Sequence, residues 1–190
     1  MNNYFGEKQF SQTNSLNNKD FPADFEDCDF RNCDFSAVNL SSCRFTDCHF
    51  ESCNFSGTKM LKTAIQNCSF KDCKILGIAF ETCSDFAFSP RFENCNMQHS
   101  SFYGIQYKGA SFLNCNLGSV DFSAAKLSEA NFENSNLEGA VFSQSNLEKA
   151  NFGGALNFNI NPNENRIKGA IFDRDSLAGL LYNYAIIIKP

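Results

Sequence analysis

A period of five residues dominates the sequence and restricts its fold more than any other feature. Every fifth position is apolar from Phe25 to Phe80 and again from Phe92 to Phe152. An α-helix repeats about every 3.6 residues and a β-strand about every two, so neither element alone explains the period. We call these apolar positions the centres. Fifteen of the 22 phenylalanines stand at centres and form the predicted core: Phe25, Phe30, Phe35, Phe45, Phe50, Phe55, Phe70, Phe80, Phe92, Phe102, Phe112, Phe122, Phe132, Phe142 and Phe152.

The residues around each centre indicate a short extended segment followed by a turn. The residue two positions before a centre is usually small, as Cys48 and Ala130 are, and the residue between is mostly Asp, Asn or Ser. The next two residues are polar or Gly, which favours a turn. A chain that turns after every five residues winds into a square coil of about twenty residues, and such coils stack as parallel strands about 4.8 Å apart. We therefore expect each central phenylalanine to point inward and to stack on the residue twenty positions away.

Two segments match the motif of a known family in full. Ala130-Asn131-Phe132-Glu133-Asn134 and Ala150-Asn151-Phe152-Gly153-Gly154 have the form A(D/N)LXX with Phe at the centre, so the chain resembles the pentapeptide-repeat proteins over residues 21–155. The resemblance implies an all-β fold, a right-handed quadrilateral parallel β-helix of roughly six coils. We expect residues 1–20 to form an N-terminal cap or an incomplete coil. Residues 156–190 are expected to form a final coil, a C-terminal helix and a dimerisation tail.

The ten cysteines share one position of the period, the small site two residues before a centre. A disulfide scaffold would suit a secreted protein. A metal site would need local CxxC-type pairs, which the sequence does not contain. Side chains on stacked parallel strands point the same way, which opposes disulfide bridges. We favour reduced thiols that act as small hydrophobic groups in the core.

The period breaks once, because Phe80 and Phe92 are twelve residues apart. The two extra residues lie within 84–91. One interpretation is a bulged corner that packs either Phe86 or Phe88 inward. The other is a short protruding loop, in which Asp85, Phe86 and Phe88 contact a partner. We do not expect both rings to be inside.

The C-terminal segment leaves the period and turns apolar. Asp173 or Asp175 is suited to cap a helix over 176–184, and a strand-like run of isoleucines follows at 186–188. Such an ending either caps the rod or pairs with another chain. The tail from Asn161 resembles the C-termini of the Qnr-type and microcin-immunity branch of the family, which implies a homodimer. The candidate dimer residues are Leu177, Leu180, Leu181, Tyr184, Ile186 and Ile188.

Acidic residues gather in parts of the chain, and the formal net charge is −5. This balance argues against direct binding of nucleic acid and permits a partner with a basic surface. The acidic stretches are consistent with an ordinary solvated surface, or with a rod that imitates DNA. The candidate partner-binding acids are Asp24, Glu26, Asp27, Asp47, Glu51, Glu129, Glu133 and Glu138.

The sequence gives no indication of an enzyme. Only His49 and His99 are present, and neither has a nearby nucleophile and supporting acid in a plausible pocket. The phosphate, dinucleotide and zinc motifs GxxxxGK[ST], GxGxxG and HExxH are absent from the sequence. We therefore expect neither catalysis nor a cofactor or metal. No apolar run reaches the ~20 residues of a membrane span, and no secretory signal is recognised, so we expect a cytoplasmic protein without membrane contact.

The resemblance to the Qnr-type branch implies a function that the amino-acid composition alone does not indicate. Qnr-type proteins bind DNA gyrase or topoisomerase IV as DNA mimics and protect the enzyme from quinolones or toxins. The chain departs from many of them, because its period contains only two extra residues where they carry sizeable loops. That departure weakens the expectation of protection more than that of binding. The alternative is a structural or scaffold protein with an unknown protein partner, since a fold does not specify a function. A role in sequestering a small molecule or toxin would need a pocket, which the sequence does not suggest.

Overall fold

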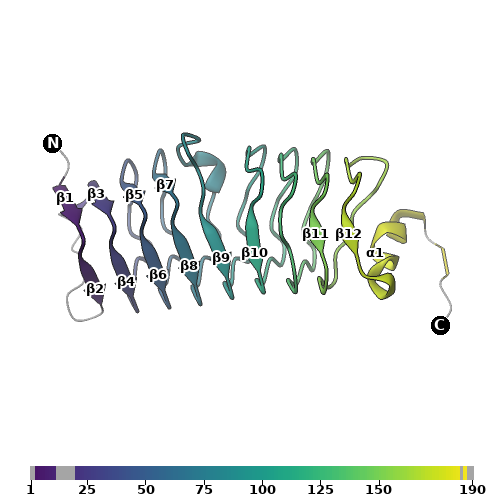
Figure 1. The fold of residues 1–190 in the computed structure, drawn as a ribbon, viewed down its shortest axis with the longest axis horizontal. Helices are drawn as coiled ribbons and strands as arrows, with labels where there is room; N and C mark the ends of the chain where they lie inside the picture. Colours follow the sequence, from purple (N-terminus) through teal and green to yellow (C-terminus); the bar gives the residue numbers. More distant parts are fainter. Residues whose placement is uncertain (1–2, 12–19, 185, 188–190) are drawn as a thin grey trace.

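The computed structural model describes residues 3–11, 20–184 and 186–187, and it confirms the predicted fold class. The chain winds into a straight, right-handed parallel β-helix whose N-terminus and C-terminus lie at opposite ends of the rod (Figure 1). Each turn stacks on the previous one through parallel backbone pairing, and the side chains at the centres fill the interior. All fifteen phenylalanines of the predicted core are buried.

Among the described residues, three parallel sheets run along the rod. One contains β1 (Asn3–Gly6), β3 (Ala23–Glu26), β5 (Arg44–Thr46) and β7 (Ala64–Gln66). The second contains β2 (Gln9–Ser11), β4 (Asp29–Arg31), β6 (His49–Glu51), β8 (Ser69–Lys71), β9 (Arg91–Glu93) and β10 (Ser111–Leu113). The third pairs β11 (Asn151–Phe152) with β12 (Ile171–Phe172). Elsewhere single parallel bridges, such as Asn116 with Asn136, continue the stacking.

The register is the one expected for a coil of about twenty residues. Phe30 lies opposite Phe50, and Phe50 lies opposite Phe70. One column of phenylalanines runs the length of the rod, and neighbouring rings stack with centroids 4.6–5.6 Å apart. Its nine rings span eight turns, more than the roughly six coils expected for residues 21–155, because β1, β2 and β12 stack on the ends of that region. The column is Phe10, Phe30, Phe50, Phe70, Phe92, Phe112, Phe132, Phe152 and Phe172.

The coil has four sides, which we call faces 1 to 4. Face 1 carries the centre Phe25, face 2 carries Phe30, face 3 carries Phe35 and face 4 carries Leu40, each with the residues that stack on it. Between faces the chain turns through a left-handed backbone conformation, with φ between 49° and 73° at the corner residues. The corner N–H donates to a carbonyl of the next turn, so the turns are held together at the corners as well as in the strands.

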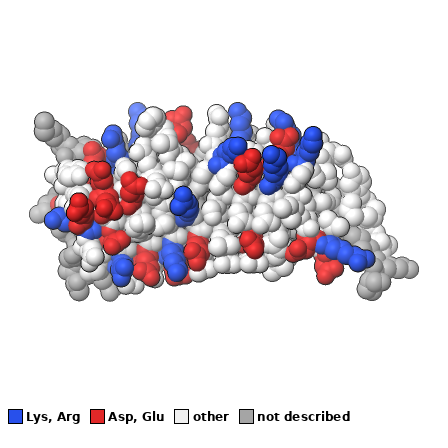
Figure 2. Space-filling view, viewed as in Figure 1, with Lys and Arg blue, Asp and Glu red and all other residues white. Residues whose placement is uncertain are grey.

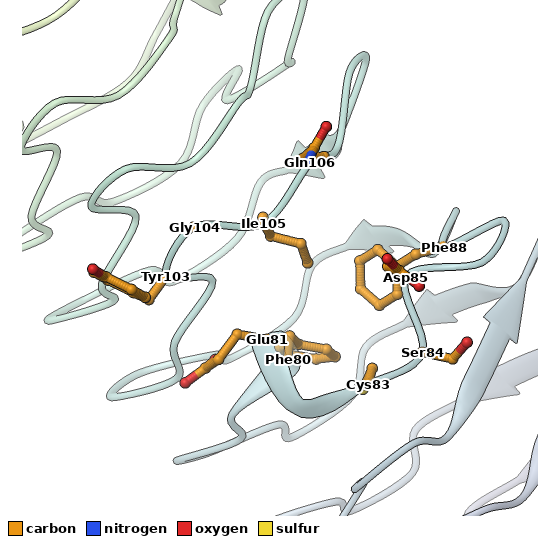
Figure 3. A pocket seen from close by; sticks show the side chains of 10 residues that line it. All are labelled: Phe80, Glu81, Cys83, Ser84, Asp85, Phe88, Tyr103, Gly104, Ile105 and Gln106. Carbon is orange, nitrogen blue, oxygen red and sulfur yellow. The ribbon is translucent and has the colours of Figure 1, made fainter.

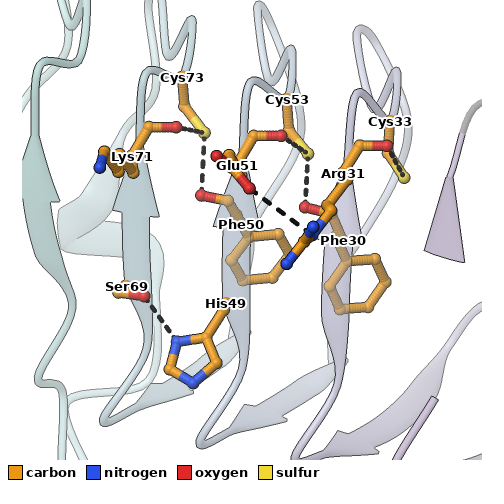
Figure 4. Close-up of polar contacts among 10 residues, drawn as sticks. All are labelled: Phe30, Arg31, Cys33, His49, Phe50, Glu51, Cys53, Ser69, Lys71 and Cys73. Carbon is orange, nitrogen blue, oxygen red and sulfur yellow. Dashed lines mark hydrogen bonds and ion pairs between the residues drawn. The ribbon is translucent and has the colours of Figure 1, made fainter. Parts of the chain in front are cut away.

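The small position beside each centre holds a group that donates to the backbone. The Sγ atom of Cys53 contacts the carbonyl oxygens of Phe30 and Glu51, each at 3.4 Å (Figure 4). At the equivalent site of a later turn, the Ser135 hydroxyl donates to the carbonyl of Phe112 at 2.6 Å. All ten cysteines are free thiols. Burial raises the pKa of the Cys43 thiol, and burial followed by the charge of Glu81 raises the pKa of Cys83 to about 12.

The two extra residues are absorbed on face 1. Phe70 of β8 pairs with Phe92 of β9, a step of 22 residues, while the other turns repeat at twenty. The 3-10 helix η2 (Phe80–Thr82) precedes the extra residues. Phe88 is buried and packs edge-on against Tyr107, with ring centroids 5.3 Å apart. Phe86, in contrast, is 75% exposed. The structure thus places one ring of the pair inside and the other outside.

The C-terminal end closes the rod with short helical turns. These are η3 (Arg174–Ser176), α1 (Ala178–Leu181) and η4 (Tyr182–Tyr184), so the predicted segment 176–184 is helical but not one continuous α-helix. The carbonyl of Gly179 accepts the N–H of Ile160 at 3.0 Å, and a side chain at Gly179 would collide with Phe158. Phe158 and Ile160 are buried beneath this segment, so the helical turns cover the last coil.

Candidate functional site

Four acidic residues gather at one corner of the N-terminal turns. Asp27 and Asp47 occupy successive corner positions of face 1 with φ near 52° and 53°, and Glu7, with φ 51°, precedes them in the same row. Glu26 stands next to Asp27 at the end of β3. We call Glu7, Glu26, Asp27 and Asp47 the acidic corner. Figure 2 shows the acidic side chains gathered over the N-terminal turns of the rod.

Neighbouring side chains support the acidic corner without neutralising it. The Tyr4 hydroxyl donates to Glu26 Oε2 at 2.9 Å, and this bond raises the pKa of Tyr4. Asn67, the next corner residue, donates from Nδ2 to Asp47 Oδ1 at 2.5 Å. Of the ion pairs found among the described residues, none involves Glu26, Asp27 or Asp47. Like charges on turns about 4.8 Å apart repel one another, so the corner favours a basic partner.

The eight acids proposed from the sequence do not lie on one face. Asp24, on β3 opposite Arg44, joins Glu26, Asp27 and Asp47 on face 1. The other four lie on different faces or are paired with basic residues, because the position within each turn of the coil decides where a side chain points. Glu51 contacts Arg31 at 3.6 Å on face 2, Glu129 contacts Lys108 and Lys149 at 3.3 and 3.9 Å, and Glu133 and Glu138 lie on faces 2 and 3. Glu7 was not among the acids proposed from the sequence. It stands twenty residues before Asp27, so the twenty-residue repeat of the coil could have identified it.

A small cavity lies beside the two-residue insertion. It holds about 310 Å³, and its apolar part is formed by Phe80, Phe88 and Ile105 (Figure 3). Asp85 lies at this cavity next to Phe88, whereas Phe86 is not among its lining residues. The volume is at the lower limit for small-molecule sites. The three residues of the predicted loop thus lie in different places: Asp85 lines the cavity, Phe86 is exposed and Phe88 is buried.

One histidine–hydroxyl contact has the distance of a catalytic pair but not its surroundings. His49 Nδ1 lies 2.7 Å from Ser69 Oγ on face 2 (Figure 4). Neither residue lines the cavity at the insertion or the groove at the C-terminal end. A base also needs a third group to orient it, and among the described residues this imidazole has a hydrogen bond to Ser69 but none to a carboxylate. His99 stands at a corner of face 3. Within the described ranges, no group of three metal-ligating side chains comes together, and no helix is long and apolar enough to cross a membrane.

The C-terminal end exposes a group of apolar side chains. Leu177, Leu181, Tyr184 and Ile186 are between 37% and 54% exposed, whereas Leu180 is partly buried against the core. Beside them lies a groove of about 650 Å³, lined in part by Phe158, Ala178 and Gly179. Of the candidate dimer residues, Ile188 lies outside the described residues. This end therefore offers an apolar surface to a partner.

Comparisons with known proteins agree with the repeat. A family model for the pentapeptide repeat region matches residues 23–85 and 84–161. Among solved structures, a trypsin-treated form of QnrB1, a plasmid-mediated fluoroquinolone resistance protein, is 18% identical over 100% of both chains with a TM-score of 0.49. HetL, a pentapeptide-repeat protein involved in heterocyst differentiation regulation from the cyanobacterium Nostoc, is 16% identical over 88% of this chain and 82% of its own, with a TM-score of 0.30. A search of curated proteins found no match.

Proposed function

Because the chain belongs to the pentapeptide-repeat family, we propose that it is a non-enzymatic interaction protein that presents its acidic corner to a basic surface of a protein partner. The observation that carries this proposal is the row of Glu7, Asp27 and Asp47 on three successive turns, with Glu26 beside it. The core behind this row is filled with side chains, which keeps the carboxylates at regular intervals. A regular row of negative charge on a stiff rod suits a partner that binds a charged polymer.

The partner we propose is a type II topoisomerase, DNA gyrase or topoisomerase IV. Sites for duplex DNA are basic because they neutralise phosphates, and a rod with regularly spaced carboxylates can occupy such a site as a DNA mimic. The resemblance of the C-terminal sequence to the Qnr-type branch supports this choice. Binding at the DNA site would protect the enzyme from quinolones or from a peptide toxin that acts on the enzyme–DNA complex.

Two further features belong to this proposal. The apolar C-terminal end, with Leu177, Leu181 and Tyr184 exposed, is proposed to join two copies into a homodimer. A cytoplasmic location is proposed because all ten thiols are free and nine of them are buried, a state that a reducing compartment maintains.

A supercoiling assay with purified gyrase, with and without ciprofloxacin, tests the proposal. We expect the protein to inhibit supercoiling or to relieve the drug's inhibition at micromolar concentration. The variant Asp27→Lys/Asp47→Lys should lose this effect, because it replaces two repelling carboxylates with two ammonium groups at the acidic corner. A matched control, Glu133→Lys/Glu138→Lys, changes the net charge equally on faces 2 and 3 and should retain the effect.

The two variants also separate mimicry from a general effect of charge. Equal loss in both would indicate that net charge alone matters, and this would contradict a site at the acidic corner. No effect of the wild-type protein on gyrase or topoisomerase IV would contradict the proposed partner and favour a scaffold role. Binding through the acidic corner should also weaken as salt rises, because exposed charges are screened beyond about 10 Å at 0.1 M salt.

A further inference from the structure

The backbone ladder between neighbouring turns is interrupted at the insertion. In other turns the residue just before a centre of face 1 donates its N–H to the preceding turn, as Lys126 does to the Ile105 carbonyl at 2.8 Å. Gln106 occupies this position directly after the insertion, and Cys83 carries the carbonyl that would be its acceptor. Within the described part of the chain, neither group makes a backbone hydrogen bond at this place. The cavity at the insertion lies in this gap, because Cys83 and Gln106 both line it.

The conformation of the insertion turn explains the gap. Ser42 and Lys62 turn the corner between faces 4 and 1 in the left-handed conformation, with φ 64° and 57°. The N–H of Ser42 donates to the next turn, at the Leu61 carbonyl, at 2.9 Å. The insertion turn forms η2 at this corner instead, and the N–H of Thr82 donates back to the Ala79 carbonyl at 3.2 Å. The insertion turn therefore lacks two of the bonds that join the other turns at this corner.

The cavity is apolar in its depth and acidic at its edge. Phe80 and Phe88 are buried and Ile105 is partly buried, and Figure 3 shows their side chains around one space. Glu81 and Asp85 line the same cavity and are exposed. Neither carboxylate takes part in an ion pair found among the described residues, and none of the residues that line the cavity is basic. A ligand here therefore meets apolar surface inside and uncompensated negative charge outside.

A thiol shows that this negative charge acts within the cavity. Cys83 lines the cavity and is the one thiol of the ten that is not fully buried. Burial, followed by the charge of Glu81, raises the pKa of Cys83 to about 12. The charge that disfavours a thiolate at this place favours a cation there, because the sign of the interaction is reversed.

We propose that this cavity binds a small primary amine with an aromatic body, in its ammonium form. The ring lies against Phe80, Phe88 and Ile105, where edge-to-face contacts between aromatic rings are favourable. The ammonium group carries three donors and no acceptor, and it donates to the carboxylates of Glu81 and Asp85. Such charge-assisted hydrogen bonds are stronger than neutral ones. Because a primary amine of this kind has a pKa near that of lysine, about 10, it is charged at pH 7.

The size of the cavity restricts the ligand further. Its volume of about 310 Å³ equals that of roughly ten water molecules at about 30 Å³ each. An arylalkylamine such as 2-phenylethylamine has a similar number of non-hydrogen atoms. A lysine side chain from a protein also presents a primary amine, but its aliphatic stem offers no ring to the two buried phenylalanines. We therefore assign the cavity to a free amine.

This site goes beyond the proposed function and does not depend on it. The acidic corner lies between faces 1 and 2 of the N-terminal turns, whereas the cavity lies between faces 4 and 1 at the insertion. The binding of an amine needs no topoisomerase, so the two proposals can fail separately. The cavity also supplies the pocket that the sequence analysis did not anticipate.

Isothermal titration calorimetry with 2-phenylethylamine at pH 7 and low salt tests the proposal. We expect one site with a dissociation constant below about 1 mM. The neutral analogue 2-phenylethanol should bind at least about tenfold more weakly, because it cannot make charge-assisted hydrogen bonds. Methylamine, which has the charge without the ring, should show no binding. An amide spectrum of ¹⁵N-labelled protein locates the ligand, since the signals of Ile105 and Gln106 should shift.

Two variants test the residues that carry the site. Glu81→Gln/Asp85→Asn should weaken the binding of 2-phenylethylamine at least about tenfold. The matched control Glu133→Gln/Glu138→Gln removes the same charge on faces 2 and 3 and should leave binding unchanged. Ile105→Phe should abolish binding by filling the cavity, and circular dichroism shows whether this variant keeps the wild-type fold.

Several results would overturn the proposal. One is the absence of binding at about 5 mM 2-phenylethylamine, and another is equal binding of 2-phenylethanol. Binding that is unchanged in Glu81→Gln/Asp85→Asn, or amide shifts confined to the acidic corner, would place the amine elsewhere. Tighter binding of N-acetyl-lysine amide than of 2-phenylethylamine would identify a side chain of a protein partner as the occupant and would contradict a free aromatic amine.

Discussion

The turns before the insertion and those after it build the same coil in different ways. Before it, faces 1 and 2 carry strands of three or four residues, whereas after β10 most turns are joined by single bridges. The side chain just before the centre accounts for much of this difference. Asn131 on face 2 and Asn146 on face 1 accept the N–H two residues later through Oδ1 and draw the chain into a turn. At the same place Arg44 and Ala64 offer no such acceptor, and the chain remains extended.

The cores of the two regions differ as well. Two turns before the insertion contain three phenylalanines each, such as Phe45, Phe50 and Phe55 followed by Met60, whereas later turns alternate Phe with Leu. In the later turns the rings of faces 2 and 4 meet across the core, as Phe122 and Phe132 do edge-on at 5.5 Å. Two different packings thus fill the same coil, and only the column on face 2 is phenylalanine throughout. The comparison teaches that the spacing of the centres defines the fold, whereas the identity of each centre defines the local packing.

The largest expected effect tests whether the two regions fold as one unit. Phe70→Asp and Phe132→Asp each bury a carboxylate in the aromatic column of face 2, and we expect each to cost more than about 4 kcal/mol. Urea unfolding followed by far-UV circular dichroism measures the loss. If Phe132→Asp melts only part of the signal while the rest unfolds at the wild-type midpoint, the two regions are separate units, as a quasi-one-dimensional rod permits. Phe70→Leu is the control for loss of the ring without a charge.

A second pair of changes exchanges the two packings within one column. Phe55 and Leu137 are both buried centres of face 3. Phe55→Leu should cost about 1–2 kcal/mol through a cavity, and Leu137→Phe about 1–3 kcal/mol through overpacking. Equilibrium denaturation measures both, with Leu137→Met as the volume-conserving control. A stabilising Leu137→Phe would show that the later turns are loosely filled and would remove the packing difference between the regions.

A smaller effect concerns the sites beside the centres, where the earlier turns mostly hold Cys and the later turns Ala or Ser. Cys53→Ser should cost less than Cys53→Ala, which should lose about 0.5–1.5 kcal/mol. The reason is that Ser135 in the same column donates its hydroxyl to the Phe112 carbonyl at 2.6 Å, so a hydroxyl fits this site. Thermal unfolding ranks the two variants. The reverse order would show that the site is purely apolar.

The smallest effect is a reactivity at the boundary between the regions. Cys83 is the one thiol of the ten that is not fully buried, and its raised pKa of about 12 leaves a thiolate fraction of about 10⁻⁴ at pH 8. Its alkylation by iodoacetamide should therefore rise about tenfold per pH unit between pH 8 and pH 11. Mass spectrometry of short reaction times follows this site. Glu81→Gln removes a neighbouring negative charge and should accelerate the reaction. An unchanged rate would show that Glu81 does not raise the pKa of Cys83.

The fold could be predicted from the sequence because every turn repeats the same pattern of apolar centres and polar corners, and the structure confirms the fold class. The features that the period did not predict lie where it is interrupted, at the insertion and after Phe152. Phe86 and Phe88 are equally apolar and two residues apart, and the backbone decides between them. Ser89 donates its N–H to the Ile65 carbonyl and receives the Asn67 N–H on its hydroxyl, and the Phe88 ring thereby enters the core. Phe158 and Ile160 are likewise buried after the period has lapsed.

The candidate surface was partly accessible from the sequence. Asp27 and Asp47 are twenty residues apart, so counting along the chain places them on one corner. The same count places Glu51 on another face. With two residues added across the insertion, it places Lys149 in the row of Asp27 and Asp47. Grouping acids by proximity along the chain misses this, because neighbouring residues in a coil point in different directions. The side-chain pairing that neutralises Glu129 depends on lysines one turn away on either side.

The two extra residues on face 1 leave the phenylalanine column on face 2 unbroken, with stacked rings at 4.6 Å before the insertion and 5.2 Å across it. The change in chain length is confined here to one side of one turn. Each side of the coil can therefore lengthen while the other three keep their stacking. For evolution and for protein engineering, this makes insertion and deletion practical ways to reshape one surface of the rod, with substitution reserved for adjusting its charge.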